Sequence, residues 1–386
     1  FFKQKTAYEM LRSLVGLGDV YKRQVMCGTC VSACPHDLLA VDEWGKRIVC
    51  VGKCPMDCKV CTDICIGLHP VEVDSSEIFG AFSEVVHVQS LMNDVKQYSY
   101  FQYQPIHRSL GDIAKPKSGV VSSILIYLLQ EGLVSCAVVA GRRGDEPWRP
   151  SPAIATNKNE VLYASGTKPF HCPTNAVLIS AVANFDRVAL VGLPCHIEGA
   201  RRLAERYKEF REQIAYLIGI PCGNIFSRDL FTKQAVDKGI DIEEIVAVDF
   251  DNAVFKEETP INNLGMYIVT RDGRRHPLSL NEFKAAMAKE CIGCKDFSAE
   301  HSDLSVATLG APTGWSTVFI RTGRGKEIIE DMVTKGLLTK RQFVYEKVKD
   351  KAKLAAQAEM VWLKSQPKTW MSIVTQALLK RARIYY

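Results

Sequence analysis

The sequence has no apolar run of about 18 residues, the length that a membrane-spanning helix needs. The apolar stretch from Val120 to Val134 is interrupted by polar residues at helical spacing, which indicates a core helix. No membrane span is therefore expected. The GxGxxG fingerprint is also missing, so a Rossmann dinucleotide site is not supported.

The main body of the chain also lacks an excess of basic residues, although the net charge of the whole chain is +6. Residues 1–24 carry +3 and residues 346–386 carry +6, which leaves −3 for residues 25–345. No nucleic-acid partner is expected from that distribution. The chain also shows no signal peptide, and its CxxC and CxxxC pairs favour metal ligands in a reducing compartment over disulfides. We expect a cytoplasmic protein, and the sequence is compatible with peripheral association at the cytoplasmic membrane face.

Cysteine, by contrast, is abundant, with eight of the fourteen lying between Cys27 and Cys65. Cys27 to Pro35 reads CGTCVSACP and Cys54 to Cys65 reads CPMDCKVCTDIC, which is close to the doubled motif of two-cluster ferredoxins. In that motif the fourth cysteine of each half serves the other cluster. The predicted ligands are Cys27, Cys30 and Cys65 for one cluster, and Cys34, Cys54, Cys58 and Cys61 for the other. Residues 38–49 between the motifs predict a short hairpin.

The first motif lacks one ligand. A C-x2-C-x2-C-x3-C motif ending at Cys34 needs a cysteine at position 24, where the sequence has Gln24. Residues 1–24 lack apolar periodicity and resemble translated sequencing-adapter sequence, so we leave them out of the fold prediction; a poorly ordered native arm is the alternative. Cys50 is an unassigned thiol and a candidate substitute. Zinc, which also binds CxxC pairs, is the competing metal.

Residues from about 80 to 345 alternate between helical and strand patterns, which predicts an α/β or α+β domain. At 386 residues, the chain has room for this domain beside a small cluster module. Helices are expected at Val120–Gln130, Ile197–Glu209 and from an N-cap at Ser227 to Lys238. Strands are expected at Val134–Val139, Val188–Leu193, Ile214–Ile220, Ile245–Phe250 and Met266–Thr270.

Two of these strands are each followed closely by a cysteine. Val188–Leu193 runs into Cys195, and Ile214–Ile220 runs into Cys222, at the sheet edge where α/β proteins bind ligands. Cys291 and Cys294 form a CxxC turn, and we predict that the four hold a further 4Fe–4S cluster. Buried apolar thiols, zinc and a redox dithiol at Cys291 and Cys294 are the alternatives. Cys136 is expected to fill the core, and Cys172 has no assigned role.

Three patches of glycine and small residues mark a candidate flavin or nucleotide site, although each is individually typical of a turn. They are Lys117–Gly119, Ala164–Lys168 and Leu309–Trp315. His196 and Lys168 are candidates for tuning a flavin electrostatically, with structural or phosphate-binding roles as the alternative. The cofactor-binding candidates are Ser118, Gly119, Ser165, Gly166, Thr167, Lys168, His196, Gly310, Ala311, Pro312, Gly314 and Trp315.

Five segments carry a family resemblance over roughly residues 25–335. They begin at Ser118 (SGVVSSILIYLLQEGLVSCAVV), Ser165 (SGTK), Gly192 (GLPCHIEGARRL), Ile220 (IPCG) and Cys291 (CIGCKDFSAEHSDLSVATLGAPTGWSTVFIRT). The chain thereby resembles the coenzyme F420 hydrogenase/dehydrogenase beta-subunit family. The resemblance implies FAD and iron–sulfur clusters, with Cys195, Cys222, Cys291 and Cys294 holding a cluster beside the flavin. It also implies that Ser118, Gly119, Thr167, Lys168 and the Gly310–Trp315 loop lie near FAD; a glycine pair is expected where Ser118 and Gly119 stand.

The expected fold class is α+β with an α/β-like core: a bacterial-type 2[4Fe-4S] ferredoxin domain at residues 25–70, then a flavin-binding domain at residues 80–345. The expected function is an oxidoreductase subunit that moves electrons between coenzyme F420, a hydride carrier, and one-electron iron–sulfur carriers through FAD. A hydrogenase, formate dehydrogenase or F420-oxidising respiratory complex would supply its partners. A ferredoxin-dependent flavin reductase with another organic substrate and a non-catalytic electron-transfer adaptor are the alternatives.

The basic tail, residues 346–386, places five apolar side chains on one helical face. They are Trp370, Ile373, Val374, Ala377 and Leu378. Docking of a partner subunit or an anionic membrane surface is one interpretation. Packing on the tail's own domain, with solvated lysines, is the other.

Overall fold

The computed structural model describes most of the chain from Gln24 to Phe343. The described residues are 24–42, 45–55, 57–69, 81–101, 119–144, 146–250, 263–279, 282, 288, 291, 294, 296–308, 311–312 and 314–343. The predictions for residues 1–23, Lys117, Ser118, Gly310, Thr313 and the basic tail therefore lie outside the described residues. No helix in the part described is long and apolar enough to cross a membrane.

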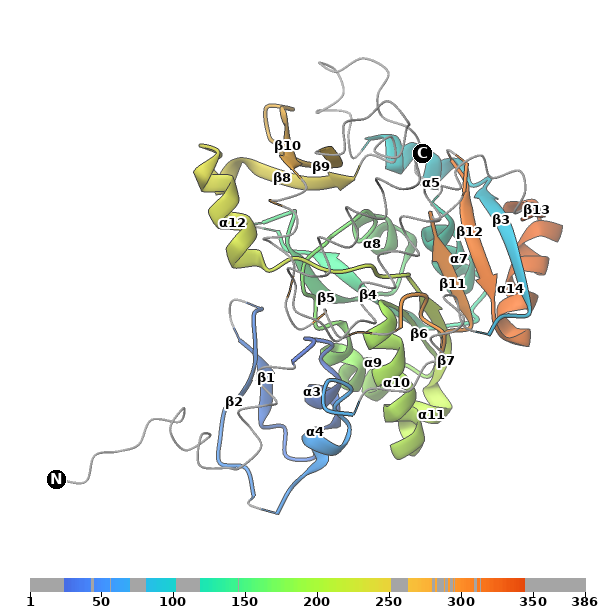
Figure 1. The fold of residues 1–386 in the computed structure, drawn as a ribbon. Coiled ribbons are helices and arrows are strands. Elements are labelled where there is room, and N and C mark those ends of the chain that lie inside the picture. Colours follow the sequence, from blue (N-terminus) through green and yellow to red (C-terminus); the bar gives the residue numbers. More distant parts are fainter. Residues whose placement is uncertain are drawn as a thin grey trace, which may run out of the picture.

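An eight-stranded mixed sheet forms the main body (Figure 1). Its four central strands, β11, β7, β6 and β4, are parallel, and antiparallel strands extend it on both sides. In spatial order the strands are β13 (Leu338–Gln342), β3 (Glu84–Ser90), β12 (Ser316–Ile320), β11 (Leu304–Ala307), β7 (Ile214–Gly219), β6 (Val188–Gly192), β4 (Cys136–Arg142) and β5 (Pro150–Ala155).

Helices cover both faces of this sheet. One face carries α7 (Val120–Gln130), α8 (Lys158–Tyr163) and α14 (Gly323–Thr334). The other carries α9 (Leu178–Asn184), α10 (Pro194–Arg206) and α11 (Lys208–Gln213). Strand residues alternate between the two cores, because successive side chains of a strand point to opposite faces: Ala189 packs with α7 and Leu190 with α10.

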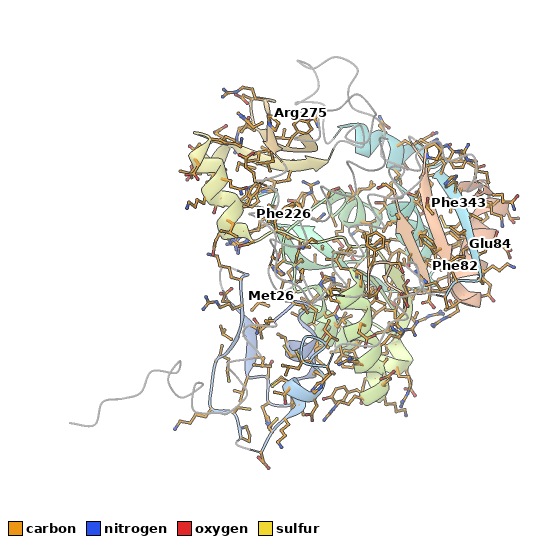
Figure 2. All side chains as sticks on the ribbon, viewed as in Figure 1. Met26, Phe82, Glu84, Phe226, Arg275 and Phe343 are labelled. Carbon is orange, nitrogen blue, oxygen red and sulfur yellow. The ribbon has the colours of Figure 1, made fainter. Side chains whose placement is uncertain are left out.

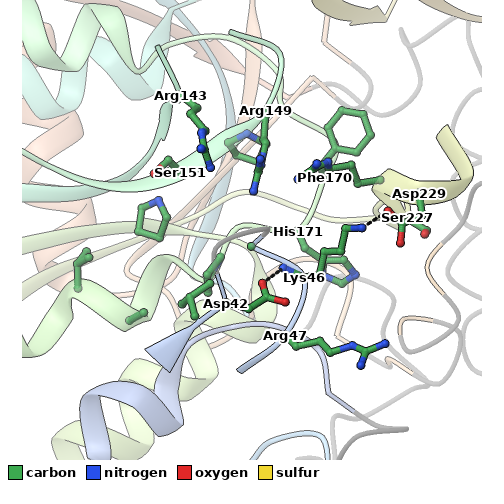
Figure 3. Close-up of a pocket in the computed structure, with 18 of the residues that line it drawn as sticks. Asp42, Lys46, Arg47, Arg143, Arg149, Ser151, Phe170, His171, Ser227 and Asp229 are labelled. Atoms are coloured by element: carbon green, nitrogen blue, oxygen red, sulfur yellow. Dashed lines mark hydrogen bonds and ion pairs between the residues drawn. The ribbon is translucent and has the colours of Figure 1, made fainter. Parts of the chain in front are cut away.

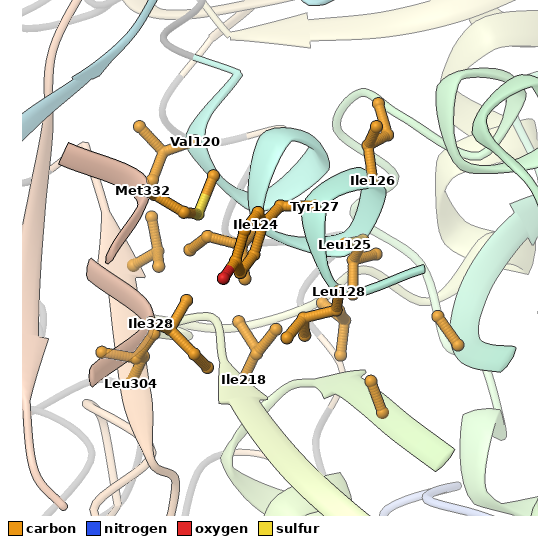
Figure 4. Close-up of a cluster of buried hydrophobic side chains, with 14 of the residues drawn as sticks. Val120, Ile124, Leu125, Ile126, Tyr127, Leu128, Ile218, Leu304, Ile328 and Met332 are labelled. Atoms are coloured by element: carbon orange, nitrogen blue, oxygen red, sulfur yellow. The ribbon is translucent and has the colours of Figure 1, made fainter. Parts of the chain in front are cut away.

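The α7 face holds the larger core. Ile124 and Ile328, from α7 and α14, meet Ile218 and Leu304 of the sheet (Figure 4). Phe82 packs edge-on against Phe319 before β3 begins, and Phe343 packs edge-on against His87 within it. Phe82 and Phe343 are labelled in Figure 2. These contacts hold β3 between its two late neighbours, β12 and β13.

Smaller units flank the sheet. The cysteine-rich segment contributes α3 (Thr29–Ala33), α4 (Val60–Asp63) and a hairpin of β1 (Leu39–Val41) with β2 (Ile48–Cys50), which confirms the predicted hairpin. It lies beside α9 and α10 (Figure 1) and joins their core through Ala33 and Ile64. A second antiparallel sheet consists of β8 (Ile245–Phe250), β9 (Asn263–Thr270) and β10 (Arg275–Ser279), and α12 (Arg228–Asp237) lies beside it. The remaining described elements are α5 (Asn93–Phe101), η1 (Thr174–Val177) and η2 (Ile242–Glu244).

Helix α7 and strand β8 have the predicted bounds, and the expected mixed α/β class is confirmed for the main body. The predicted helix Ile197–Glu209 is wrong at both ends. It starts at Pro194, because the fixed φ of proline suits the first helical position, and it breaks at the extended residue Tyr207. Cys195 and His196 therefore lie in the first turn of α10, which was expected to begin only at Ile197. The strand predicted at Val134–Val139 is displaced to Cys136–Arg142, since Val134 closes the turn after α7 through its N–H to Leu128.

Candidate redox site

The first group of thiols comprises Cys27, Cys30 and Cys65. Burial raises the pKa of Cys30, and the neighbouring thiols of Cys27, Cys65 and Cys61 raise it further. Burial likewise raises the pKa of Cys27, where Cys65 adds a smaller contribution. The three residues predicted to share one cluster are thus brought together by α3 and the segment after α4.

The second group comprises Cys34, Cys54, Cys58 and Cys61, also as predicted from the spacing. Burial raises the pKa of Cys61, with Cys58 and Cys34 as the next causes. Desolvation raises the pKa of Cys54 to about 11, and Cys58 and Cys50 contribute further. Cys50 therefore lies beside the second group, where its thiol donates to the Gly52 carbonyl at 3.1 Å, and does not lie in the vacant position of the first.

Gln24 occupies the place of the missing ligand in the first motif. Its amide exchanges hydrogen bonds with the backbone of Ile48 in β2, at 3.3 Å to the N–H and 3.5 Å to the carbonyl. The side chain is thus engaged with the hairpin. As the sequence stands, three cysteines form the first group.

The third group forms at the carboxyl ends of β6 and β7. Gly192 and Gly219 are paired across these strands, so Cys195 and Cys222 leave the sheet at one level. Burial raises the pKa of Cys195 well above its usual value, and four neighbouring thiols raise it further: Cys27, Cys222, Cys294 and Cys291. Cys222 and Cys291 pack around Ile225, and the Cys222 N–H donates to the Phe297 carbonyl at 2.9 Å. Cys195 thus has the other three predicted ligands among its neighbours, and that the four hold one cluster stays a prediction.

Cys27 links the first group to the third, since it is among the thiols that act on Cys195. The segments meet at two glycines. A Cβ on Gly28 would lie 2.5 Å from the Ala176 nitrogen, and one on Gly199 of α10 would lie 1.9 Å from the Thr29 hydroxyl oxygen. Side chains at these positions would separate the segments, so both glycines allow the close approach.

Asn175 ties this contact together. Its Nδ2 donates to the His196 carbonyl at 2.8 Å and to Thr29 Oγ1 at 3.0 Å, while its backbone N–H donates to the Cys27 carbonyl at 3.0 Å. The Ser32 hydroxyl donates to the Asn175 carbonyl at 2.5 Å. Asn175, in η1, thus connects the cysteine segment with the start of α10.

The same network favours one direction for a hydrogen bond to sulfur. Asn175 Nδ2 can only donate, so Thr29 Oγ1 is its acceptor. The Thr29 proton is then available to Cys27 Sγ, which lies 3.2 Å away. Hydrogen bonds to ligand sulfurs are among the groups that set the reduction potential of an iron–sulfur cluster.

The donor set fits iron–sulfur clusters. Every ligand candidate is a thiol, the usual holder of such clusters, and the buried thiols need a metal to become thiolates. Among the described residues, no three His, Cys, Asp or Glu side chains are placed around a point that a single metal ion would occupy. That the three groups hold iron–sulfur clusters, and not zinc, stays a prediction.

Comparison with known proteins identifies the family of this chain. Residues 185–345 match the C-terminal family of the coenzyme F420 hydrogenase/dehydrogenase beta subunit, and residues 114–179 match the corresponding N-terminal family. Together the matches span more than half of the sequence. The chain belongs to the coenzyme F420 hydrogenase/dehydrogenase beta-subunit family. Membership implies a flavin and iron–sulfur clusters.

Individual relatives support this assignment. The chain is 30% identical to the coenzyme F420-dependent sulfite reductase of Methanocaldococcus jannaschii over 78% of its own length but only 44% of that protein. It is 27% identical to a subunit of the F(420)H(2) dehydrogenase of Methanosarcina mazei, covering 80% of the chain and 81% of the relative. It is 28% identical to the coenzyme F420 hydrogenase beta subunit of Methanothermobacter thermautotrophicus, over 67% and 84%.

A solved structure shares the fold. A chain of the F420-reducing [NiFe] hydrogenase complex from Methanosarcina barkeri, determined with xenon, superposes with a TM-score of 0.61. The match covers 76% of this chain and 92% of that one at 22% sequence identity. The mixed sheet of this beta-subunit family member is thus a fold found in a subunit of that complex.

The predicted flavin residues that the structure describes gather at the same sheet edge as Cys195. Gly119 begins α7 with a φ of 65°, and Arg142 at the end of β4 donates to the Ser165 carbonyl at 2.8 Å. Lys168 Nζ donates to the carbonyls of Ala164 and Gly166 at 2.6 and 3.0 Å. Ala311, Pro312, Gly314 and Trp315 follow β11. Their contact with a flavin stays a prediction.

His196 is enclosed by protein. It is 4% exposed, its Nδ1 accepts the Leu193 N–H at 3.1 Å, and burial lowers its pKa to about 4. The ring is therefore neutral at pH 7 and stabilises the first turn of α10 beside Cys195. Cys136 is fully buried in the α10 core, as expected, and Cys172 is a buried loop thiol 5% exposed.

Sequence reasoning missed Thr29, Asn175 and Gly199, which assemble the contact between the first and third groups. Thr29 lies between two predicted ligands, which was a usable signal. Asn175 and Gly199 carry no local signal, because their roles depend on segments about 150 residues away in sequence.

Proposed function

We propose that this chain is an oxidoreductase subunit that exchanges electrons between coenzyme F420 and one-electron iron–sulfur carriers, with FAD between them. The observation that carries the proposal is the proximity of Cys27 to Cys195 in a member of the F420 beta-subunit family. When bound, a flavin supplies the exchange between two-electron hydride and one-electron chemistry. Cys195, Cys222, Cys291 and Cys294 would hold the cluster on the main domain.

The chain's own residues supply position and shielding. Cys27 is buried and Cys30 and Cys195 are partly buried, which limits water at these sulfurs, and Gly28 with Gly199 allows the two backbones to approach. Asn175 holds the first and third groups in one arrangement. The second group, with the exposed Cys54, lies at the outer side and suits the exit toward a protein partner.

The relatives belong to different enzymes: a sulfite reductase, an F(420)H(2) dehydrogenase and a hydrogenase. All three names contain coenzyme F420, which is why we place it before another organic substrate. A hydrogenase, formate dehydrogenase or F420-oxidising respiratory complex is the corresponding assembly. We assign the chain to a cytoplasmic setting on its thiol chemistry.

The test is turnover with reduced F420. Protein prepared without oxygen, with FAD and reconstituted clusters, is mixed with reduced F420 and a viologen dye, and oxidation is followed at the deazaflavin absorption band. We expect F420-dependent dye reduction that Cys195→Ser abolishes and Cys136→Ala retains, since Cys136 is a core thiol outside the three groups. A protein that holds flavin and iron yet does not oxidise F420 would rule out F420 as the substrate. It would favour a ferredoxin-dependent reductase of the same family.

A further inference from the structure

A fifth thiol, Cys50, lies beside the second group of cysteines. Cys50 ends β2 and stands across the hairpin from Leu39 in β1. Facing residues of an antiparallel pair have Cα atoms only about 4.5–5.5 Å apart. The Leu38 N–H donates to Cys34 Sγ at 3.4 Å, and the Leu38 carbonyl accepts the Val51 N–H at 2.9 Å. Leu38 thus joins a predicted ligand of the second cluster to the residue that follows Cys50.

Cys54 is the member of the second group that motif and burial support least. In the standard C-x2-C-x2-C-x3-C motif the first cysteine would stand at position 55, which is Pro55 here, whereas Cys54 lies one residue further from Cys58. Of the fourteen cysteines, all of which the structure describes, Cys54 alone is exposed. Residues 51–55 are exposed along their whole length. The predicted ligand at this corner of the cluster therefore sits on a solvent-facing loop.

Cys50, by contrast, belongs to a paired strand. The β1–β2 hairpin reaches the main domain at its turn, where Lys46 Nζ lies 2.5 Å from Asp229 of α12 (Figure 3). At the other end of β2 the Cys50 side chain is half-buried, and its thiol donates to the Gly52 carbonyl at 3.1 Å. The sulfur is thus turned toward the loop that carries Cys54. Two thiols, one on a strand and one on an exposed loop, are available for one corner of the second cluster.

We propose that Cys50 is an alternative ligand of the second cluster and can take the place of Cys54 on its iron. In this exchange the bond from iron to the Cys54 sulfur breaks and a bond from the same iron to the Cys50 sulfur forms. The proton of the Cys50 thiol passes through solvent to the Cys54 thiolate, because only a thiolate binds the metal. No electron is transferred, so the exchange needs no oxidant. The inference rests on the proposed function, since it requires a cluster in the second group.

The experiment compares wild type with Cys54→Ala and with Cys50→Ala/Cys54→Ala, because alanine cannot bind iron. The matched control is Cys54→Ala/Cys136→Ala, which also removes two thiols but keeps Cys50; Cys136 is a core thiol outside the three groups. All proteins are reconstituted without oxygen under identical conditions. One measurement is iron and acid-labile sulfide per chain. The other is the rate at which iodoacetamide alkylates Cys50 in the folded protein, followed by peptide mass spectrometry.

We expect Cys54→Ala to hold as much iron and sulfide as wild type. Alkylation of Cys50 should slow about tenfold in this variant, because the sulfur becomes bound to metal and loses its nucleophilic character. Cys50→Ala/Cys54→Ala should hold less iron and sulfide than Cys54→Ala, whereas the control with Cys136→Ala should not. Protection of Cys50 and alkylation of Cys54 already in wild type would also support the proposal, with Cys50 as the resting ligand.

Three results would overturn the inference while leaving the clusters and the proposed function in place. They are loss of iron in Cys54→Ala, equal alkylation of Cys50 in wild type and Cys54→Ala, and equal iron content in the two double variants. Wild type that takes up neither iron nor sulfide would overturn the proposed function together with the inference. The alkylation measurement needs only a single substitution at an exposed position, so it decides the question even where a double variant does not fold.

Discussion

Thr29 is the residue whose chemistry is most directly testable. Its hydroxyl lies 3.2 Å from Cys27 Sγ and accepts from the amide of Asn175, which leaves its proton for that sulfur, and a cluster-bound thiolate can only accept. Thr29→Val keeps the shape and removes the donor, so the first cluster should become harder to reduce, with a more negative midpoint potential. The measurement is an anaerobic redox titration followed by electron paramagnetic resonance.

Two controls separate this effect from a general loss of structure. Thr29→Ser retains the hydroxyl and should restore the wild-type potential. Thr62→Val sits beside Cys61, but the Thr62 hydroxyl donates to the Lys59 carbonyl at 2.7 Å, so the potential of the first cluster should not change. An unaltered potential in Thr29→Val with full iron content would contradict the hydrogen-bond assignment.

Position 24 offers a second test at the residue scale. The first group has three thiols, and Gln24 lies where the motif needs the fourth. Gln24→Cys should raise iron and acid-labile sulfide per chain and slow cluster loss in air, because a complete cubane has four protein ligands. Chemical analysis of both proteins after identical reconstitution checks this. Equal iron content and equal lifetimes would show that the fourth thiol is unnecessary.

The cysteine groupings were predictable because ligand spacing is a local property of the sequence. CxxC and CxxxC pairs fix which thiols lie on one turn, and two strands ending in Cys195 and Cys222 imply a shared sheet edge. The contact through Asn175 was not predictable, since it depends on how α3 docks against α10.

At the scale of helices, the packing of α3 on α10 depends on Gly199. A Cβ there would lie 1.9 Å from Thr29 Oγ1 and 2.9 Å from Asn175 Nδ2. Gly199→Ala should lower stability by roughly 1–3 kcal/mol, the usual cost of overpacking, despite the better helix propensity of alanine. Thermal unfolding measures it.

The matched control is Gly323→Ala in the first turn of α14. Nothing lies within 4 Å of a Cβ built at Gly323, so this change should be neutral or stabilising by up to about 1 kcal/mol. Equal melting temperatures for the two variants would contradict the close contact between α3 and α10.

Helices α7 and α14 are joined by a buried phenol. The Tyr127 hydroxyl donates to Asp331, and burial, helped by that carboxylate, raises the pKa of Tyr127 to about 12. In the unfolded chain the Tyr127 hydroxyl ionises near pH 10. The contribution of the Tyr127–Asp331 hydrogen bond to stability is therefore complete below pH 10 and is lost as the pH rises toward 12. The loss should reach about 1.4 kcal/mol at pH 11. Urea unfolding of wild type and Tyr127→Phe at pH 9 and 11 measures this loss. If the free energy of unfolding falls equally in both proteins between the two pH values, ionisation of Tyr127 is not its cause.

Helix and strand positions were predictable where one pattern dominated. Val120–Gln130 is apolar on a helical period and lies against the sheet as α7. Five strands of the large sheet were not predicted: β3, β5, β11, β12 and β13. Tertiary pairing, which no local window contains, decides their structure.

At the scale of the whole molecule, the described residues of the cysteine segment form little core of their own. Ala33 and Ile64 are its fully buried contributions to the core it shares with α9 and α10. Clusters would therefore supply much of its folding energy, as in other small metal-dependent modules. Removing iron with a chelator should increase amide hydrogen exchange in residues 24–69 and leave β4, β6 and β7 protected. Mass spectrometry resolves the two regions, and uniform protection after iron loss would show a self-sufficient fold.

The place of β3 in the sheet has a consequence for how the protein is made. Residues 84–90 are synthesised early, but the strands on both sides, β12 and β13, begin at Ser316 and Leu338. At about 5–20 residues per second, the ribosome needs roughly 10–45 seconds to deliver the first of them. Throughout that interval both edges of β3 lack their partners, and unpaired edges invite pairing with other chains. The yield of active protein should therefore depend on what shields this strand during translation.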